Sequence, residues 1–97
     1  MTHAVILRRK AEDDIRKVLR WYESQDPSLG EQFLIELRRT LEQIGQFPES
    51  SPAMHKSVRR ALIRRFPYLV FYLAEAARVV VLAVLHTSRD PAVWPKR

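Results

Sequence analysis

Apolar residues recur along the chain first with a helical period and then with a strand period. Between residues 11 and 46 the spacings are three and four, as in helices that bury one stripe. Asp26-Pro27 divides this region, since Asp caps a helix start and Pro is tolerated at the first helical position. We predict a first helix with the stripe Ala11, Ile15, Val18, Leu19 and Tyr22, and a second, from Pro27 to about Gln46, with the stripe Leu29, Phe33, Leu37, Leu41 and Ile44. Gly45 stands near the expected end of the second helix, and the two helices should pack as an antiparallel hairpin.

Strand patterns lie on both sides of the helical region. A short apolar run predicts a strand from about Thr2 to Arg8, and β-rich segments follow at Val58–Arg65, Tyr68–Glu75 and Arg78–His86. The proline- and serine-containing stretch 47–57 should be an exposed connector. The predicted fold is α+β: an N-terminal strand, a two-helix antiparallel hairpin and a three-stranded antiparallel meander (β-α-α-β-β-β). A chain of 97 residues supports one core, so we expect 1–97 to be a single domain in which about 91–97 form a tail.

The last strand is apolar on both faces. Alternation places Val79, Val81, Ala83 and Leu85 on one face and Val80, Leu82 and Val84 on the other. The helix hairpin covers only one face, so the other needs the tail with Trp94, an oligomer or a separate chain. Alternatively, the tail and long arginine stems are cover enough. Trp21 and Ile35 lie away from their helical stripes; each alone is ordinary, but together they allow an interface.

Charge and composition narrow the function classes. The net charge of +6 suits nucleic acid, a nucleic-acid enzyme or an acidic protein, or it serves solubility alone. The absence of cysteine excludes a disulfide framework, a thiol nucleophile and a thiolate metal site. The longest apolar stretch, Val79 to Leu85, is far short of the roughly 20 residues of a membrane-spanning helix, and residues 1–10 lack the form of a secretion signal. We expect a cytoplasmic protein with no membrane contact and no cofactor.

Two groups of polar residues could form a binding or catalytic site. Arg59, Arg60, Arg64 and Arg65 bracket one short strand, where they either capture phosphate or carboxylate groups or protect an edge strand from aggregation. His86, Arg89 and Asp90 follow the last strand, and Tyr72 lies on the preceding one, so these four groups could converge for acid–base work on a phosphodiester. In the structural alternative, His86 bonds to the backbone or to Asp90, and Arg89 pairs with Asp90. His3 and His55 are too isolated in sequence to indicate a metal site.

Four segments follow one another along nearly the whole chain: Ala11-Glu12-Asp13-Asp14-Ile15, Phe47-Pro48-Glu49, residues 65–72 (RFPYLVFY) and residues 84–91 (VLHTSRDP). Their order and spacing resemble those of the ParE/RelE toxin superfamily of type II toxin–antitoxin systems. The ending His86-Thr87-Ser88-Arg89-Asp90 resembles the ParE branch, which poisons DNA gyrase. The basic loop and C-terminal tyrosine or histidine–tyrosine pair of the RelE branch, which cleaves messenger RNA on the ribosome, are missing.

This resemblance implies a toxin that is neutralised by direct binding of a cognate ParD-like antitoxin in a hetero-oligomer, with gyrase as the target. We expect no catalytic residue, no metal and no sequence-specific DNA binding by this chain alone. The predicted target-binding residues are Arg60, Arg64, Arg65, His86, Arg89 and Trp94, and the predicted antitoxin-binding residues are Trp21, Ile35, Val80, Leu82 and Val84. The alternative is a ribosome-dependent mRNA endonuclease in which His86 transfers a proton and Arg64, Arg65 and Arg89 stabilise the phosphate transition state. A third possibility is a chain that has kept the fold and lost toxicity.

Overall fold

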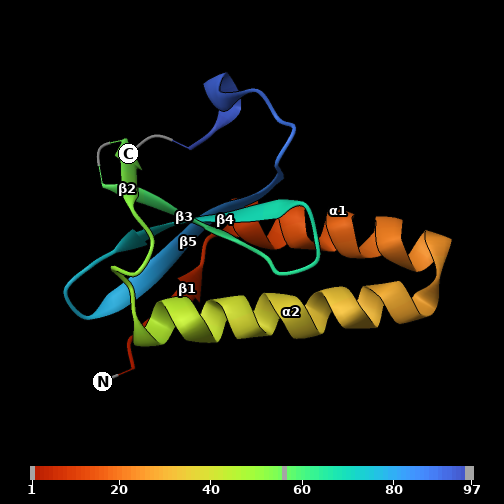
Figure 1. Ribbon diagram of the computed structural model, residues 1–97, viewed down its shortest axis with the longest axis horizontal. Helices are drawn as coiled ribbons and strands as arrows, with labels where there is room; N and C mark the ends of the chain where they lie inside the picture. Colours follow the sequence, from red (N-terminus) through yellow and green to blue (C-terminus); the bar gives the residue numbers. More distant parts are fainter. Residues whose placement is uncertain (1, 56, 96–97) are drawn as a thin grey trace.

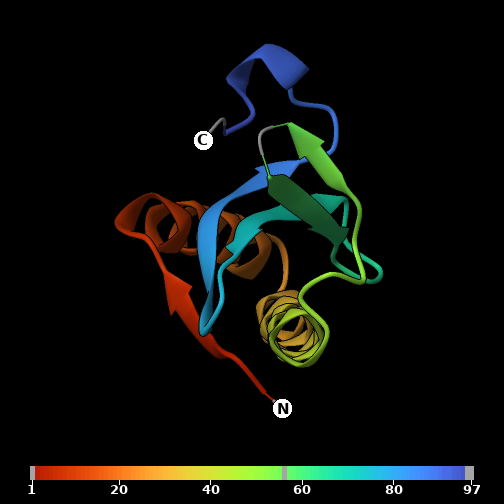
Figure 2. The same cartoon turned by 90° about the vertical axis from the view of Figure 1, so that its left-hand side faces the viewer.

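A mixed five-stranded sheet carries two helices on one face in a computed structural model that describes residues 2–55 and 57–95 (Figures 1 and 2). The α+β prediction, with a strand, a helix hairpin and a C-terminal meander, is confirmed. The elements in chain order are β1 (Ala4–Leu7), α1 (Arg9–Gln25), α2 (Pro27–Gln46), β2 (Ala53–His55), β3 (Val58–Leu62), β4 (Tyr68–Ala74), β5 (Arg78–His86) and the short 3-10 helix η1 (Pro91–Val93).

The helix hairpin follows from local chemistry at its bend. The Asp26 carboxylate accepts a hydrogen bond from the Ser28 N–H at 2.9 Å, and Pro27 occupies the first position of α2. Gly45 does not cap the end of α2: it lies in the last turn, where β1 passes close by. A Cβ there would stand 3.1 Å from Val5 Cγ2 and 3.2 Å from the His3 carbonyl oxygen, so the small residue permits the close approach of helix and strand.

The strand order is β1-β5-β4-β3-β2, with β1 parallel to β5 and every other pair antiparallel. β1 thus joins the far side of the meander and makes β5 an interior strand. β2 forms within the segment predicted as a connector and pairs irregularly with β3. β3 ends at Leu62, three residues earlier than predicted, because the chain turns towards β4, with Arg65 in the left-handed region at φ 71°.

Strict alternation along β5 is wrong from Leu82 onward. Phe71 pairs with Ala83 whereas the next residue, Tyr72, pairs with Val81, so Leu82 is an extra residue in a β-bulge. Beyond the bulge the faces are exchanged: Ala83 packs with the second-face cluster, and Val84 packs under the helices. Val84 therefore does not share a surface with Val80 and Leu82, as predicted.

The second face of the sheet is covered by the chain's own tail. η1 and Trp94 fold back over this face, on the side of the sheet opposite α2 (Figures 1 and 2). The Trp94 ring centroid lies 5.4 Å from that of Phe71, and the Arg60 guanidinium lies 4.9 Å from the Trp94 centroid. Of the covers considered for this face, the structure shows the tail together with an arginine stem.

Candidate functional site

Two adjoining cavities lie where β5 leaves the sheet beside α1. They have volumes of about 260 and 360 Å³ and share Trp21, Tyr68 and His86. Together we call them the Trp21 groove; its remaining lining residues are Asp14, Lys17, Val18, Tyr22, Pro67, Val84, Leu85 and Arg89. Of the predicted site residues, Trp21, Val84, His86 and Arg89 line this groove.

The groove forms because β1 is too short to cover the whole edge of β5. β1 ends at Leu7, and the last bond of this pairing runs from the Arg8 N–H to the Val81 carbonyl oxygen at 3.0 Å. Beyond that point, the buried Asp14 carboxylate on α1 accepts the Val84 N–H at 3.0 Å through Oδ2. Its Oδ1 atom accepts Lys10 Nζ at 2.6 Å. Asp14 thus replaces the missing strand, as buried polar groups require a partner.

Sequence reasoning missed Asp14 as a functional position, although a signal was present. Asp14 lies three residues after Ala11 and four before Val18, which places a carboxylate inside the buried stripe of α1. A charged residue at such a position indicates a specific buried partner.

His86 is held by the turn that follows β5. Its Nδ1 atom accepts the Ser88 backbone N–H at 3.0 Å and lies 2.8 Å from Ser88 Oγ. A backbone N–H can only donate, so the neutral imidazole carries its proton on Nε2. Ser88, rather than Asp90, is thus the polar partner that orients His86.

Tyr68, rather than the predicted Tyr72, is the tyrosine beside His86. Tyr68 pairs with His86 across β4 and β5, and their ring centroids are 5.1 Å apart in an edge-on arrangement. Tyr72 is fully buried towards the helices, and its hydroxyl donates to the Pro48 carbonyl oxygen at 2.8 Å. The predicted convergence of Tyr72 with His86 is therefore wrong.

Burial in the aromatic cluster behind the groove raises the pKa of two tyrosines. The pKa of Tyr68 rises because the phenolate would lose hydration, and the pKa of Tyr22 rises for the same reason and through its charge interaction with Tyr68. Tyr22 packs against Trp21, Phe66, Phe33 and Tyr68 at centroid distances of 5.1, 5.1, 5.8 and 6.2 Å. Both phenols are neutral hydrogen-bond donors at physiological pH.

Asp90 serves the tail instead of a catalytic cluster. Its Oδ1 atom accepts the Ala92 N–H at 2.9 Å and caps η1. The Arg89 backbone N–H donates to the His86 carbonyl oxygen at 3.0 Å, which closes the turn between them. The Asp90 carboxylate therefore has a structural partner of its own.

The arginines around β3 divide among three environments. Arg59 donates to the Ser51 carbonyl oxygen, and Arg60 lies over Trp94 on the second face. Arg64 and Arg65 lie in the exposed turn after β3, where Arg65 Nη2 donates to Gln32 Oε1 at 3.1 Å. This turn is close to the end of β5, because the Thr87 N–H donates to the Pro67 carbonyl oxygen at 2.9 Å.

The predicted antitoxin-binding residues differ widely in exposure. Trp21 is 55% exposed on α1 and Ile35 is 42% exposed on α2. Val80 and Leu82 are buried in the second-face cluster that Trp94 covers, and Val84 is buried on the helix side. Only the two helix residues are accessible in this conformation.

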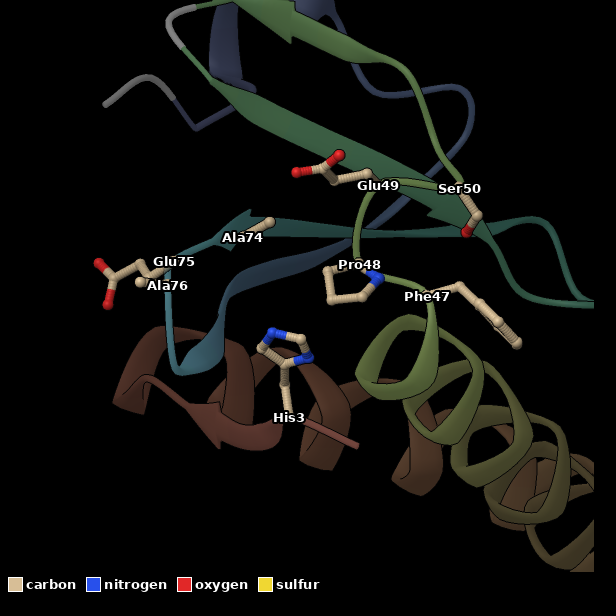
Figure 3. Close-up of a pocket in the computed structure, with 8 residues that line it drawn as sticks. All are labelled: His3, Phe47, Pro48, Glu49, Ser50, Ala74, Glu75 and Ala76. Carbon is tan, nitrogen blue, oxygen red and sulfur yellow. The ribbon is translucent and has the colours of Figure 1, made fainter. Parts of the chain in front are cut away.

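A larger cavity of about 580 Å³ lies at the opposite end of the sheet (Figure 3). The start of β1, the loop after α2 and the β4–β5 turn surround it, and the His3 ring projects towards Pro48 and Ala74. Within the described residues, His3 Nδ1 is buried without a hydrogen-bond partner. Glu75 at its rim pairs with Arg78 at 2.7 Å. None of the residues that line this cavity was predicted from the sequence as part of a binding site.

Across residues 2–55 and 57–95, no three His, Cys, Asp or Glu side chains gather in an arrangement that could hold a metal ion. In the same part of the chain, neither helix is long and apolar enough to cross a membrane.

Comparison with known proteins assigns the family. The family model described as the ParE toxin of the type II toxin–antitoxin system parDE matches residues 5–91. A search of curated protein sequences finds no match. The fold is similar to a chain described as the chromosomal ParDE toxin–antitoxin system of P. aeruginosa, with a TM-score of 0.76, 15% identity, and coverage of 88% of this chain and 96% of that one. The family match spans most of the chain and includes every lining residue of the Trp21 groove. This chain therefore belongs to the ParE toxin family of type II toxin–antitoxin systems.

Proposed function

We propose that this chain is a toxin that binds and poisons DNA gyrase in the cytoplasm and that direct binding of a ParD-like antitoxin neutralises it. The family assignment supports the toxin role. The structure supports binding rather than catalysis, since Asp90 and Tyr72, the groups expected to act together with His86, each have a separate partner. The toxin then acts by occupying a surface of its target, without a chemical step of its own.

The hydrogen-bond partners of the polar groups around His86 are the observation that carries this proposal. Acid–base catalysis needs a positioned proton acceptor and donor within hydrogen-bond reach of the reacting group. His86 Nδ1 is occupied by Ser88, Asp90 caps η1, and Tyr72 bonds to Pro48. Among residues 2–55 and 57–95, no carboxylate orients the imidazole in the way that catalytic histidines are oriented.

Two basic surfaces remain as candidates for the target. His86 and Arg89 line the Trp21 groove, and the exposed turn with Arg64 and Arg65 lies at the same end of the sheet. Arg60 and Trp94 form the second surface, on the tail-covered face. A gyrase surface with acidic residues would complement either one.

The exposed apolar residues of the helices support an antitoxin interface. Trp21 and Ile35 are large, half-exposed side chains on α1 and α2, and large aromatic residues are enriched at interface hot spots. An amphipathic antitoxin segment of acidic character would cover apolar surface and offset the positive charge of the toxin.

A supercoiling assay tests the proposed target. Purified toxin should inhibit gyrase supercoiling and leave linearised DNA, and an equimolar amount of the protein encoded by the adjacent gene should restore activity. Arg89→Gln should weaken inhibition, whereas Arg38→Gln, an equal charge change on an exposed part of α2, should not. Undiminished supercoiling at saturating toxin would contradict the gyrase assignment.

A ribosome-dependent mRNA endonuclease is the second candidate, because Tyr68, His86 and Arg89 do share one groove. Primer extension on messenger RNA from induced cells separates the two, since cleavage within codons belongs only to the nuclease. Growth of cells with and without the adjacent gene reveals whether the chain is toxic at all.

A further inference from the structure

The polar side chains of the Trp21 groove present hydrogen-bond donors and positive charge. Lys17 and Arg89 supply cations, His86 presents its Nε2–H, and Tyr68 keeps its phenolic proton. The groove lacks a free carboxylate within its described lining, because Asp14 is engaged by Lys10 and by the Val84 N–H. A ligand that fits this lining is rich in acceptors and negatively charged.

The same groove has an aromatic platform. Trp21 is 55% exposed and stands edge-on to Tyr22, whose ring is supported by the buried Phe33 and Phe66. Lys17 lies four residues before Trp21 and therefore on the same side of α1. An exposed ring beside cations is the arrangement with which proteins stack one base and neutralise the neighbouring phosphates.

We infer that the Trp21 groove binds single-stranded DNA, with one base stacked on Trp21 and the flanking phosphates held by Lys17 and Arg89. Tyr68 and His86 donate hydrogen bonds to the same segment from the sheet side. Such binding is tolerant of base sequence, since every base has a face that can stack. The inference does not depend on the gyrase proposal, because it concerns a ligand that the groove binds directly.

The donor-rich lining also favours DNA over the nearest alternatives. Recognition of RNA uses the ribose 2′-hydroxyl as both donor and acceptor, and among the described lining residues only the phenol oxygens of Tyr22 and Tyr68 could receive its proton. A glutamate-rich peptide without apolar side chains would satisfy the cations, but it would leave the exposed indole of Trp21 uncovered.

Fluorescence anisotropy of a labelled thymidylate dodecamer with the full-length chain, at about 50 mM salt, tests the inference. Trp21→Ala should weaken binding by about 5- to 150-fold, equivalent to the roughly 1–3 kcal/mol of one stacked base. Trp21→Phe, which keeps a stacking ring, should retain most of the affinity. Phe47→Ala removes an aromatic ring that is 62% exposed at the other end of the molecule, and it should change nothing.

The salt dependence of oligonucleotide binding distinguishes direct contacts with phosphates from a general effect of the net charge. Lys17→Gln and Arg89→Gln should each reduce the slope of log K against log salt by about 0.7, the value for one phosphate on a single strand. Arg38→Gln changes the net charge equally, outside the groove, and should leave the slope unchanged. Thermal melts of every variant verify folding.

Four outcomes would overturn the inference. Two concern the DNA itself: no binding by the unmodified chain, or equal affinities of the Trp21→Ala and Phe47→Ala variants. The other two concern competing ligands: displacement of the oligonucleotide by a glutamate-rich peptide of equal charge, or a uridylate dodecamer that binds more than about tenfold tighter than thymidylate. Failure here would leave gyrase inhibition untouched, whereas loss of gyrase inhibition with intact oligonucleotide binding would refute only the target proposal.

Discussion

Removing the Asp14 carboxylate should weaken the attachment of α1 to the end of β5 and lower the stability of the chain. Asp14→Ala deletes a buried hydrogen bond from a charged acceptor, which contributes about 1.5–3 kcal/mol, and leaves the buried Val84 N–H without a partner. The ion pair with Lys10 adds little, because that lysine side chain is 62% exposed. We expect a loss of about 2–3 kcal/mol from a total stability of about 5–15 kcal/mol, and a fall in Tm of about 8–24 °C.

Urea unfolding and amide hydrogen exchange check this expectation together. Asp14→Asn keeps an oxygen acceptor and should lose only about 1 kcal/mol. Asp13→Ala removes the neighbouring exposed pair with Arg16 and should cost less than about 0.5 kcal/mol. In Asp14→Ala the Val84 amide should lose protection selectively. Equal destabilisation by Asp13→Ala and Asp14→Ala, or an unchanged Val84 amide, would refute the reasoning.

Three further perturbations test other parts of the structure. Gly45→Ala should destabilise the chain by about 1 kcal/mol in urea unfolding, because the new Cβ meets a backbone oxygen at 3.2 Å. Gly30→Ala should gain little of the about 0.5–1 kcal/mol that alanine usually gives a helix, because its Cβ would stand 2.6 Å from Glu23 Cγ and 3.2 Å from Leu19 Cδ1, so both side chains must shift. Trp94→Ala should cost about 2 kcal/mol and produce binding of a hydrophobic dye, since it uncovers the second face. The raised pKa values of Tyr22 and Tyr68 mean that the folded state holds its phenolic protons more tightly, so stability should be full below pH 10 and fall as the pH rises beyond it, as urea midpoints in an alkaline series would show.

Local chemistry made much of the fold predictable. Both ends of α2 match the prediction, because Asp26-Pro27 encodes its start and the apolar stripe persists to its last turn. Both ends of β5 match as well, since its long β-branched run has no competing pattern. Signals of this kind depend on residues within a few positions of one another.

Features that depend on distant contacts escaped prediction. The pairing of β1 with β5 joins segments at the two ends of the chain, and β2 is only three residues long. The position of the bulge at Leu82 cannot be predicted from the sequence, because every residue of this apolar run is compatible with a regular strand. In the candidate site, His86 and Arg89 were identified, but Tyr68 was passed over for Tyr72 because the register of the β4–β5 hairpin decides which tyrosine reaches His86.

The parallel pairing of β1 with β5 also determines when the protein can fold during its synthesis. β1 has no neighbour in the sheet until residues 78–81 have been added, 74 positions after Leu7 when counted to Val81. At about 5–20 residues per second, the ribosome needs roughly 4–15 s to cover that interval. The helix hairpin can form early, but it has no sheet to pack on, and the Trp21 groove has no floor until Val84 emerges. Folding is therefore a late, nearly all-or-none event, and a nascent chain that stalls before β5 presents apolar helices without assembling any part of the mature surface.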